Sequence, residues 1–403
     1  MASTINTNIN SLNAQRNLGT SQGSLATSMQ RLSSGLRVNS AKDDAAGLAI
    51  AERMNTQVRG LTVGARNSND GISLAQTAEG ALGKVGDMLQ RMRELAVQAG
   101  NATNSKADRA ALQAEVAQLI DEVDRVAKQT SFNGTKILDG SFSGAVFQVG
   151  ANSGDNITVG RLTNTTAKGL ADVAYAYDTN TGVQASSVSQ LTEITSASAL
   201  RINDGTTTWD LGPVKAASSG TERMGQMVEA INRKSADTGV TAFLTKDAAG
   251  TYTIDIVSSK LNSSGDAVSM ALTGFTVANS GHDGAIASEI DASTTTTDAL
   301  GIDTLTVDTQ RNAWVALKKI DAAIDQVNNA RADLGALQSR FENSVGSIEI
   351  QVENLSASRG RIVDADFAKE TANLSRTQIL QQAGTAMVAQ ANQLPQGVLA
   401  LLQ

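Results

Sequence analysis

The sequence has no cysteine and a single histidine, His282, among its 403 residues. Without cysteine there is no disulfide, thiolate nucleophile or cysteine metal site, and one histidine leaves little for metal binding or acid–base catalysis. His282 lies in the turn-like segment SGHDG, so the HExxH helix of zinc proteases is absent. Neither a GxGxxG nor a GxxxxGK[ST] loop occurs. We therefore expect no enzymatic activity, no cofactor and no bound metal.

Proline and aromatic residues are also scarce, and they are unevenly placed. Proline occurs only at Pro213 and Pro395. Nine of the twelve aromatic residues fall between Phe132 and Phe275, and none precedes Phe132. Aromatic side chains dominate globular cores, so the long stretches at both ends were not built around such a core. This distribution predicts a central globular part flanked by two long arms.

Basic character is missing as well. The formal net charge is -7, whereas phosphate binding needs a basic face, so we expect no nucleic acid as a partner. The first residues, MASTINTNINSLNAQRNL, contain neither a basic segment nor a continuous apolar segment. We therefore expect no cleaved secretory signal peptide.

Charged side chains are missing from the last part of the chain, because none follows Arg376 in the final 27 residues. Glutamine and asparagine interrupt the apolar residues there too often for a membrane span, which needs roughly 20 mostly apolar residues. The apolar residues recur at helical spacing, which predicts a helix bent or broken only near Pro395. The stripe that we expect to pack against other helices includes Leu380, Met387, Leu394, Val398 and Leu401.

Residues 3–35 have the same character at the other end of the chain, with Arg16 and Arg31 as their only charged side chains. Their apolar residues also recur mostly in steps of three and four, which predicts a helix. Two weakly charged helices at opposite ends predict that each is the packing partner of the other. The stripe of this first helix includes Ile5, Ile9, Leu12, Leu18, Leu25, Met29 and Leu32.

A joint, meaning a break between two helical segments, is expected after the first stripe, beginning at Gly35. Asp43 and Asp44 then stand where an N-cap and a first helical turn would place them, because carboxylates accept from the free N–H groups there. The alternative, a catalytic or metal-binding carboxylate pair, lacks further ligands nearby. The segment SASRGRI predicts a second joint at Gly360, before the terminal stretch.

Between the joints, the sequence predicts long helices. A helical pattern of apolar residues runs over 45–100, and a second one follows a turn at 101–105, so we expect an antiparallel pair. The pattern resumes from about residue 308 and continues to Leu355.

The part between these helices has a different pattern. From Phe132 short alternating stretches and the turn Asn133-Gly134 predict β-hairpins. Further on we expect a small α+β domain with the strand-like segment ALRINDGTTTWDL, an amphipathic helix over 222–236, and strands VTAFL and YTIDIV around a turn at 247–250.

Long stretches of both arms strongly resemble bacterial flagellin. They fall within residues 1–170 and 305–403 and read INTNINSLNAQRNL, QRLSSGLRVNSAKDDAAGLAIAERM, NDGISLAQTAEGAL, LQRMRELAVQAGNATN, ADLGALQSRFE and ENLSASRGRIVDADFAKETANLSRTQIL. In the central part, ALRINDG with the following helix and VTAFL looks like the short repeat module of many flagellins and hook-associated proteins.

The resemblance implies a mainly α fold with a β-rich insert: long antiparallel coiled-coil helices from both termini, a β-hairpin region and a small α+β outer domain. Residues 1–42 and 357–403 would form the two halves of an inner helical domain. Residues 43–175 and 301–356 would form the two parts of a rod domain, and residues 176–300 a variable insert exposed on the surface.

The implied function is a structural subunit that self-assembles into the bacterial flagellar filament for swimming motility. It would be exported by the flagellar type III route and would lie outside the cell. Its partners would be copies of itself in a helical homopolymer, the flagellar cap and hook–filament junction proteins, and an export chaperone on the C-terminal helix. In an inner tube the subunits would pack through Ile5, Ile9, Leu12, Leu25, Met29, Leu32, Leu380, Met387, Leu394, Val398 and Leu401.

A further partner implied by the resemblance is the Toll-like receptor through which hosts sense flagellin. The segment that it recognises corresponds to LQRMRELAVQ and the facing helix, centred on Arg91, Leu95 and Glu115. Without the resemblance, Leu95 would be read as a packing residue and the two charged residues as ordinary surface groups. Met92 is a departure inside this motif.

Two alternative functions stay open. A hook–filament junction protein shares both arms, but it should form a ring only a few subunits deep and lack the full terminal pattern. An adhesin carried by the insert leaves no pattern that the sequence reveals.

Overall fold

The computed structural model describes residues 7–195, 200–246, 251–275, 289–290 and 301–400. The chain forms two compact units. The first consists of Met1–Gly71, Val146–Ile157 and Arg340–Gln403, and the second of Ile72–Ala145 and Thr158–Ser339. Two long helices, α2 (Ala45–Ala99) and α7 (Gln310–Val363), contribute residues to both units.

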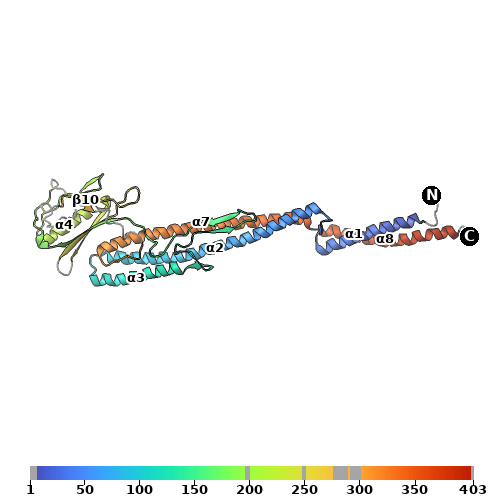
Figure 1. The fold of residues 1–403 in the computed structure, drawn as a ribbon, viewed down its shortest axis with the longest axis horizontal. Helices are drawn as coiled ribbons and strands as arrows, with labels where there is room; N and C mark the ends of the chain where they lie inside the picture. The colour runs from blue at the N-terminus through green and yellow to red at the C-terminus, as the bar shows by residue number, and fades with distance from the viewer. Residues whose placement is uncertain (1–6, 196–199, 247–250, 276–288, 291–300, 401–403) are drawn as a thin grey trace. The chain divides into compact units, whose positions relative to one another are not determined.

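The first unit contains the two terminal helices, α1 (Ile9–Ser34) and α8 (Phe367–Ala400), which lie side by side (Figure 1). Their direction is antiparallel, because Asn8 contacts Ala391 while Leu36 forms an isolated β-bridge with Asp364. The expected pairing of the two terminal helices is therefore confirmed.

The helix α8 continues through Pro395, so the break that was one of the two expected outcomes there does not occur. Proline has no backbone N–H, so the carbonyl four residues earlier, at Ala391, loses its helical hydrogen-bond donor. The side chain of Asn8 replaces that donor, because its Nδ2 donates to the Ala391 oxygen at 2.7 Å.

Among the helices in the described part of the chain, α8 included, none is long and apolar enough to cross a membrane.

Elsewhere in the first unit, α2 packs closely against two other segments. The short strands β3 (Ala145–Gln148) and β4 (Asn156–Val159) pair with each other. A Cβ on Gly64 of α2 would lie 2.4 Å from the backbone oxygen of Val149 in their connecting loop, and a Cβ on Gly71 would lie 2.6 Å from the ring of Phe341. Glycine at both positions allows this close approach.

In the second unit, α3 (Lys106–Gln129) and α7 both lie beside α2 (Figure 1). An ion pair joins Arg91 of α2 to Glu115 of α3 at 2.8 Å, and another joins Arg93 of α2 to Asp321 of α7 at 2.6 Å. The predicted antiparallel arrangement of the long helices is confirmed. Their buried residues recur at helical spacing and include Leu82, Val85, Leu89, Met92, Val116, Ile120, Val123, Ile320, Ala323 and Val327.

A short hairpin follows α3. Its strands are β1 (Ser131–Phe132) and β2 (Thr135–Lys136). The two turn residues, Asn133 and Gly134, have φ values of 48° and 79°, the left-handed conformations that such two-residue turns require.

The insert is an α+β arrangement of two antiparallel sheets. One sheet has the order β5 (Ala176–Val183), β9 (Tyr252–Ser258), β8 (Val240–Lys246). The other has the order β11 (Glu289–Ile290), β10 (Met270–Thr273), β6 (Arg201–Asn203), β7 (Thr208–Asp210). Both sheets and the helix α4 (Gly220–Asn232) supply one apolar core, which includes Ile202, Met227, Ile231, Val240, Ile254, Ile256 and Met270. A short 3-10 helix lies at Ala185–Ser187 and the short helix α5 at Ser235–Thr238.

Two expectations for the insert need correction. The segment ALRINDGTTTWDL forms a hairpin of β6 and β7 rather than one strand, because Asp204 Oδ1 accepts hydrogen bonds from the N–H groups of Thr206 and Thr207 and closes a turn. The expected helix over 222–236 is divided into α4 and α5. The predicted strands VTAFL and YTIDIV are confirmed as parts of β8 and β9, while the turn at 247–250 lies outside the described residues.

The second joint also lies later than expected. The helix α7 continues through SASRGRI to Val363, and Gly360 lies inside its last turn, where its carbonyl accepts from the Asp364 N–H at 2.8 Å. One glycine in a helix interior costs only about 1 kcal/mol relative to alanine, which is too little to end a well-packed helix. The break comes where Asp366 caps α8, because its Oδ1 accepts from the N–H groups of Ala368 and Lys369.

The close approach at Gly64 yields a test of the fold. Gly64→Ala places a Cβ against a backbone carbonyl that cannot rotate away, so we expect it to destabilise the protein by about 1–3 kcal/mol. Gly80→Ala in the same helix is the matched control, because nothing lies within 4 Å of its Cβ position, and it should stabilise by up to about 1 kcal/mol. Thermal unfolding followed by circular dichroism measures both changes, and equal midpoints for the two variants would contradict the packing described.

Candidate functional site

The contact between α1 and α8 follows one stripe on each helix, spaced in alternating steps of three and four residues. This is the spacing of a coiled-coil contact. The buried and half-buried positions of this stripe are Ser11, Ala14, Leu18, Ser21, Leu25, Ser28 and Leu32 on α1, and Glu370, Leu374, Thr377, Gln381, Gly384, Val388 and Ala391 on α8; Arg31, Thr371 and Asn373 beside it are also half-buried. Small and polar residues make up most of both stripes.

These small residues bring the two helices close together. A Cβ on Gly384 would lie 3.1 Å from Leu18 Cδ1, and Ser11 Oγ donates to Asn392 Oδ1 at 2.6 Å. Such contacts bury little apolar surface, and burial of apolar surface is the main source of stability between helices. The pair is therefore closely packed but weakly stabilised by its own contacts.

Many of the large apolar residues predicted for packing lie outside this contact and are exposed. Ile9, Leu12, Met29, Leu380 and Met387 are between 48% and 66% exposed. We call these five residues the outer apolar face.

The remaining predicted stripe residues divide between two groups. Leu18, Leu25 and Leu32 lie half-buried in the contact between the helices. Ile5 and Leu401, and the side chains of Leu394 and Val398, lie outside the described residues. The sequence pattern did not separate the two faces because both carry large apolar residues at helical spacing, while most other inner positions are small or polar.

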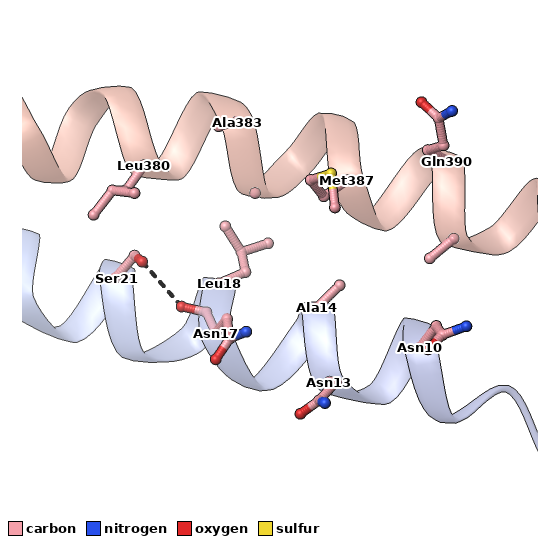
Figure 2. A pocket seen from close by; sticks show the side chains of 12 residues that line it. Asn10, Asn13, Ala14, Asn17, Leu18, Ser21, Leu380, Ala383, Met387 and Gln390 are labelled. Carbon is pink, nitrogen blue, oxygen red and sulfur yellow. Dashed lines mark hydrogen bonds between the residues drawn. The ribbon is translucent and has the colours of Figure 1, made fainter.

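A groove of about 470 Å³ runs between the two helices on the outer side. Figure 2 shows the side chains of Leu380 and Met387 on the α8 wall directed toward α1, with Leu18 directed toward α8. Ala14 and Ala383 extend this apolar lining. The groove is also lined by the amide residues Asn10, Asn13, Asn17 and Gln390. The groove therefore combines an apolar centre with amide groups and has no charged lining residue.

Charged lining residues appear in a second hollow between the same helices, nearer the joint. Arg31 of α1 and Arg376 of α8 line it together with Glu370, which is buried, and with several threonine and serine residues. The terminal pair is thus polar near the joint and apolar farther along α8.

At the first joint, the end of α1 lies against the segment that connects α7 to α8. Gly35 ends α1 in the left-handed conformation, with φ of 71°, and its carbonyl accepts from the Ala365 N–H at 2.9 Å. The Arg37 N–H donates to the Val363 oxygen at 2.6 Å, and Arg37 Nη2 donates to the Ile362 oxygen at 2.6 Å. These bonds tie the end of α1 to the end of α7, so both breaks occur at the same level.

The two carboxylates after this joint have separate tasks. Asp44 caps α2, because its Oδ1 accepts from the Gly47 N–H at 2.8 Å. Asp43 closes the preceding turn: the Ser40 hydroxyl donates to it at 3.0 Å, with further bonds from the N–H groups of Asn39 and Ser40, and these lower the pKa of Asp43. Its contribution is therefore present above the ordinary aspartate pKa and is lost as the pH falls through the lowered value.

The three residues expected at the receptor site lie on the long helices. Arg91 and Glu115 have side chains about half exposed, at 50% and 45%, and Arg91 also pairs with Glu94 at 2.9 Å. Hydrogen bonds to Glu94 and Glu115 raise the pKa of Arg91, which keeps its charge. Leu95 is only 1% exposed, so it lies in the core between the helices.

Similarity to known proteins agrees with this arrangement of helices. Residues 5–143 match the bacterial flagellin N-terminal helical region, residues 317–402 the bacterial flagellin C-terminal helical region, and residues 199–260 the flagellin hook IN motif. Flagellin C of Vibrio cholerae serotype O1 is 39% identical, and flagellin A of Vibrio anguillarum 40% identical, each over 100% of both chains. The chain belongs to the bacterial flagellin family.

As a flagellin, the chain is a structural subunit of the flagellar filament. The B-type flagellin of Pseudomonas aeruginosa is 37% identical over 100% of both chains. A solved structure of FliC from Burkholderia pseudomallei is 30% identical over 67% of this chain and 99% of that chain, with a TM-score of 0.38. The hook IN match covers β6 to β9, which confirms the expectation of a flagellin-type repeat module in the insert.

The cap at the first joint yields a prediction for stability. Asp44→Ala leaves the N–H of Gly47 without its acceptor and should lower the free energy of unfolding by about 0.5–2 kcal/mol. Asp44→Asn is the matched control, because asparagine caps helices as well as aspartate does. Chemical denaturation followed by circular dichroism compares the two, and a loss as large in the asparagine variant would show that charge rather than capping matters.

Proposed function

We propose that copies of this chain polymerise by burying the outer apolar face and the groove of the α1–α8 pair against neighbouring subunits. The observation that carries this proposal is the exposure of five large apolar side chains on two helices with very few charges. Exposed apolar patches mark sites of protein association, and Leu380 and Met387 line one apolar groove. A helical homopolymer gives every subunit the same neighbours, so each outer face is covered by another copy.

The energetics of the terminal pair favour burial between subunits. Ordering a residue costs about 1–2 kcal/mol of backbone entropy, and the inner stripe of small residues returns little apolar burial to offset it. Burying a leucine or methionine fully contributes about 1.5–3 kcal/mol. Leu380 and Met387, which are 48% and 63% exposed in the isolated subunit, would add this stabilisation only in the polymer.

The other proposed partners act before and after assembly. Before assembly, an export chaperone would cover the apolar side chains of α8, because they would otherwise promote association inside the cell. The subunit would leave by the flagellar type III route, and the filament would lie outside the cell. There the cap and hook–filament junction proteins would contact its two ends.

Shortening one side chain of the groove tests the proposal. Leu380→Ala removes apolar surface that polymerisation would bury, so we expect the critical concentration for filament growth to rise about tenfold, which corresponds to about 1.4 kcal/mol. Purified monomers of the full chain are seeded with filament fragments, and growth is followed by light scattering and negative-stain electron microscopy.

The control is Leu261→Ala, which shortens an exposed leucine of the insert and should leave the critical concentration unchanged. Equal effects of the two substitutions, or no effect of either, would show that the groove is not buried between subunits. Intact chains that form rings a few subunits deep instead of long filaments would favour a junction protein.

We also propose that Arg91 and Glu115 form part of a surface recognised by a Toll-like receptor of hosts. Support comes from their exposure and from the 2.8 Å ion pair that places them side by side on adjacent helices. Leu95 would act differently, because a side chain that is 1% exposed contributes by holding the helices together rather than by touching a receptor.

Substitutions separate these two roles. Arg91→Ala should reduce receptor activation about tenfold, as truncation of an interface arginine costs more than about 1 kcal/mol, without changing thermal stability. Leu95→Ala should lower the thermal midpoint, because emptying a buried leucine site costs about 2–5 kcal/mol. The measurements are a receptor reporter-cell assay and thermal unfolding of each monomer.

Arg125→Ala is the matched control for the arginine variant, because Arg125 is 51% exposed and paired with Glu122 on α3. It should activate the receptor normally. Full activation by Arg91→Ala would place the receptor surface elsewhere.

A further inference from the structure

Only two methionines among the described residues have exposed side chains, Met29 and Met387. Met29 is 57% exposed and does not line the groove, whereas Met387 is 63% exposed and lines its centre. The other described methionines are buried or half-buried in the long helices and the insert. The two exposed methionines therefore differ in position but not in access to small reagents.

The surroundings of Met387 are apolar. Figure 2 shows its side chain on the α8 wall of the groove, on the same wall as Leu380 and Ala383 and facing the α1 residues Ala14 and Leu18. The lining contains no charged residue. A thioether fills such a site as well as a hydrocarbon does, because it is flexible and nearly apolar.

We propose that Met387 is a reversible oxidation site that decides whether a subunit enters the filament. In the unassembled chain, the sulfur lone pair of Met387 attacks one oxygen of a peroxide. The O–O bond breaks, the attacked oxygen stays on the sulfur as a sulfoxide, and its proton passes to the other oxygen, which leaves as water when the oxidant is hydrogen peroxide. The thioether is oxidised by two electrons and the peroxide is reduced by two, so no further reactant is needed.

The product no longer suits the groove. Methionine sulfoxide is polar, and burying a polar group without hydrogen-bond partners is unfavourable. The inference rests on the proposed function, because the cost arises only if a neighbouring subunit covers Met387. Thiol-dependent methionine sulfoxide reductases reverse the oxidation, so a rejected subunit regains competence when reduced.

The same geometry limits when the site reacts. A neighbour that covers the groove also keeps peroxide away from the sulfur. Met387 is therefore reactive before assembly and protected afterwards, while the filament already built keeps its contacts under the same oxidant.

Three variants test the proposal in the full chain. Met387→Leu keeps the apolar volume but cannot be oxidised, and such swaps are well tolerated. Met387→Gln places a polar group of similar length at the same position and imitates the sulfoxide. Met29→Leu is the matched control, because it removes the other exposed methionine and leaves Met387 oxidisable.

Monomers are treated with hydrogen peroxide, freed of it and seeded, and the critical concentration is measured by light scattering. We expect oxidation to raise it about tenfold, or about 1.4 kcal/mol, in the unaltered chain and in Met29→Leu, and to leave Met387→Leu nearly unchanged. Met387→Gln should show the increase without oxidant. Incubation with methionine sulfoxide reductase and a thiol should restore growth of the oxidised chain.

Peptide mass spectrometry supplies an independent readout. The sulfoxide at Met387 should accumulate quickly in monomers and at least about tenfold more slowly in filaments, whereas a groove that stays open would react equally in both. Loss of growth in oxidised Met387→Leu, protection by Met29→Leu, or normal growth of Met387→Gln would each overturn the proposal.

These failures are distinguishable from failure of the proposed function. If untreated chains do not polymerise, self-assembly itself is wrong. If untreated chains polymerise and oxidised ones do so at the same critical concentration, only the role of Met387 is wrong.

Discussion

The contact between α1 and α8 is the constraint on which the rest of the structure depends. Its inner stripe consists mostly of small and polar residues with a few leucines and one valine, so the helices approach closely but bury little apolar surface. The larger apolar groups are left on the outside of the pair. A richer inner stripe would make the subunit stable alone, but it would leave nothing for neighbours to cover. The division of residues between the two faces therefore couples the order of the terminal pair to association.

The joint connects this weak pair to the start of α2 and the end of α7. Backbone bonds tie the end of α1 to the end of α7, and Asp44 starts α2 immediately beyond. Along α2, glycines at positions 64 and 71 admit a backbone loop and an aromatic ring at distances that any side chain would prevent. Local stability is thus concentrated in tight packing and capping of the long helices, while the terminal helices depend on contacts made later.

The sequence was sufficient for the helices, the hairpin turn at Asn133-Gly134 and the α+β character of the insert, because each has a clear periodic or turn signal. The sequence was insufficient where a residue pattern is weak or fits more than one structure. Gly360 was read as a break although a single glycine costs a packed helix little.

Leu380 and Met387 were correctly placed on one helical stripe, but helical spacing does not reveal whether a stripe faces its own partner helix or solvent. Apolar spacing predicts only Leu18, Leu25 and Leu32 of the inner stripe, because serine and glycine also occur on exposed surfaces. The apolar groove depends on the pairing of two distant segments, which only the folded chain displays.

The hydrogen bond from Asn8 to the carbonyl of Ala391 has a consequence for chain integrity. Pro395 leaves that carbonyl without its helical donor, and the substitute comes from a residue that lies 383 positions away along the chain. The end of α8 is therefore complete only when the beginning of the same chain is present and folded against it. A chain that is cut short near either terminus exposes an unpaired backbone group at this point. Both ends must therefore be present and folded together before the subunit offers its outer face to a growing polymer.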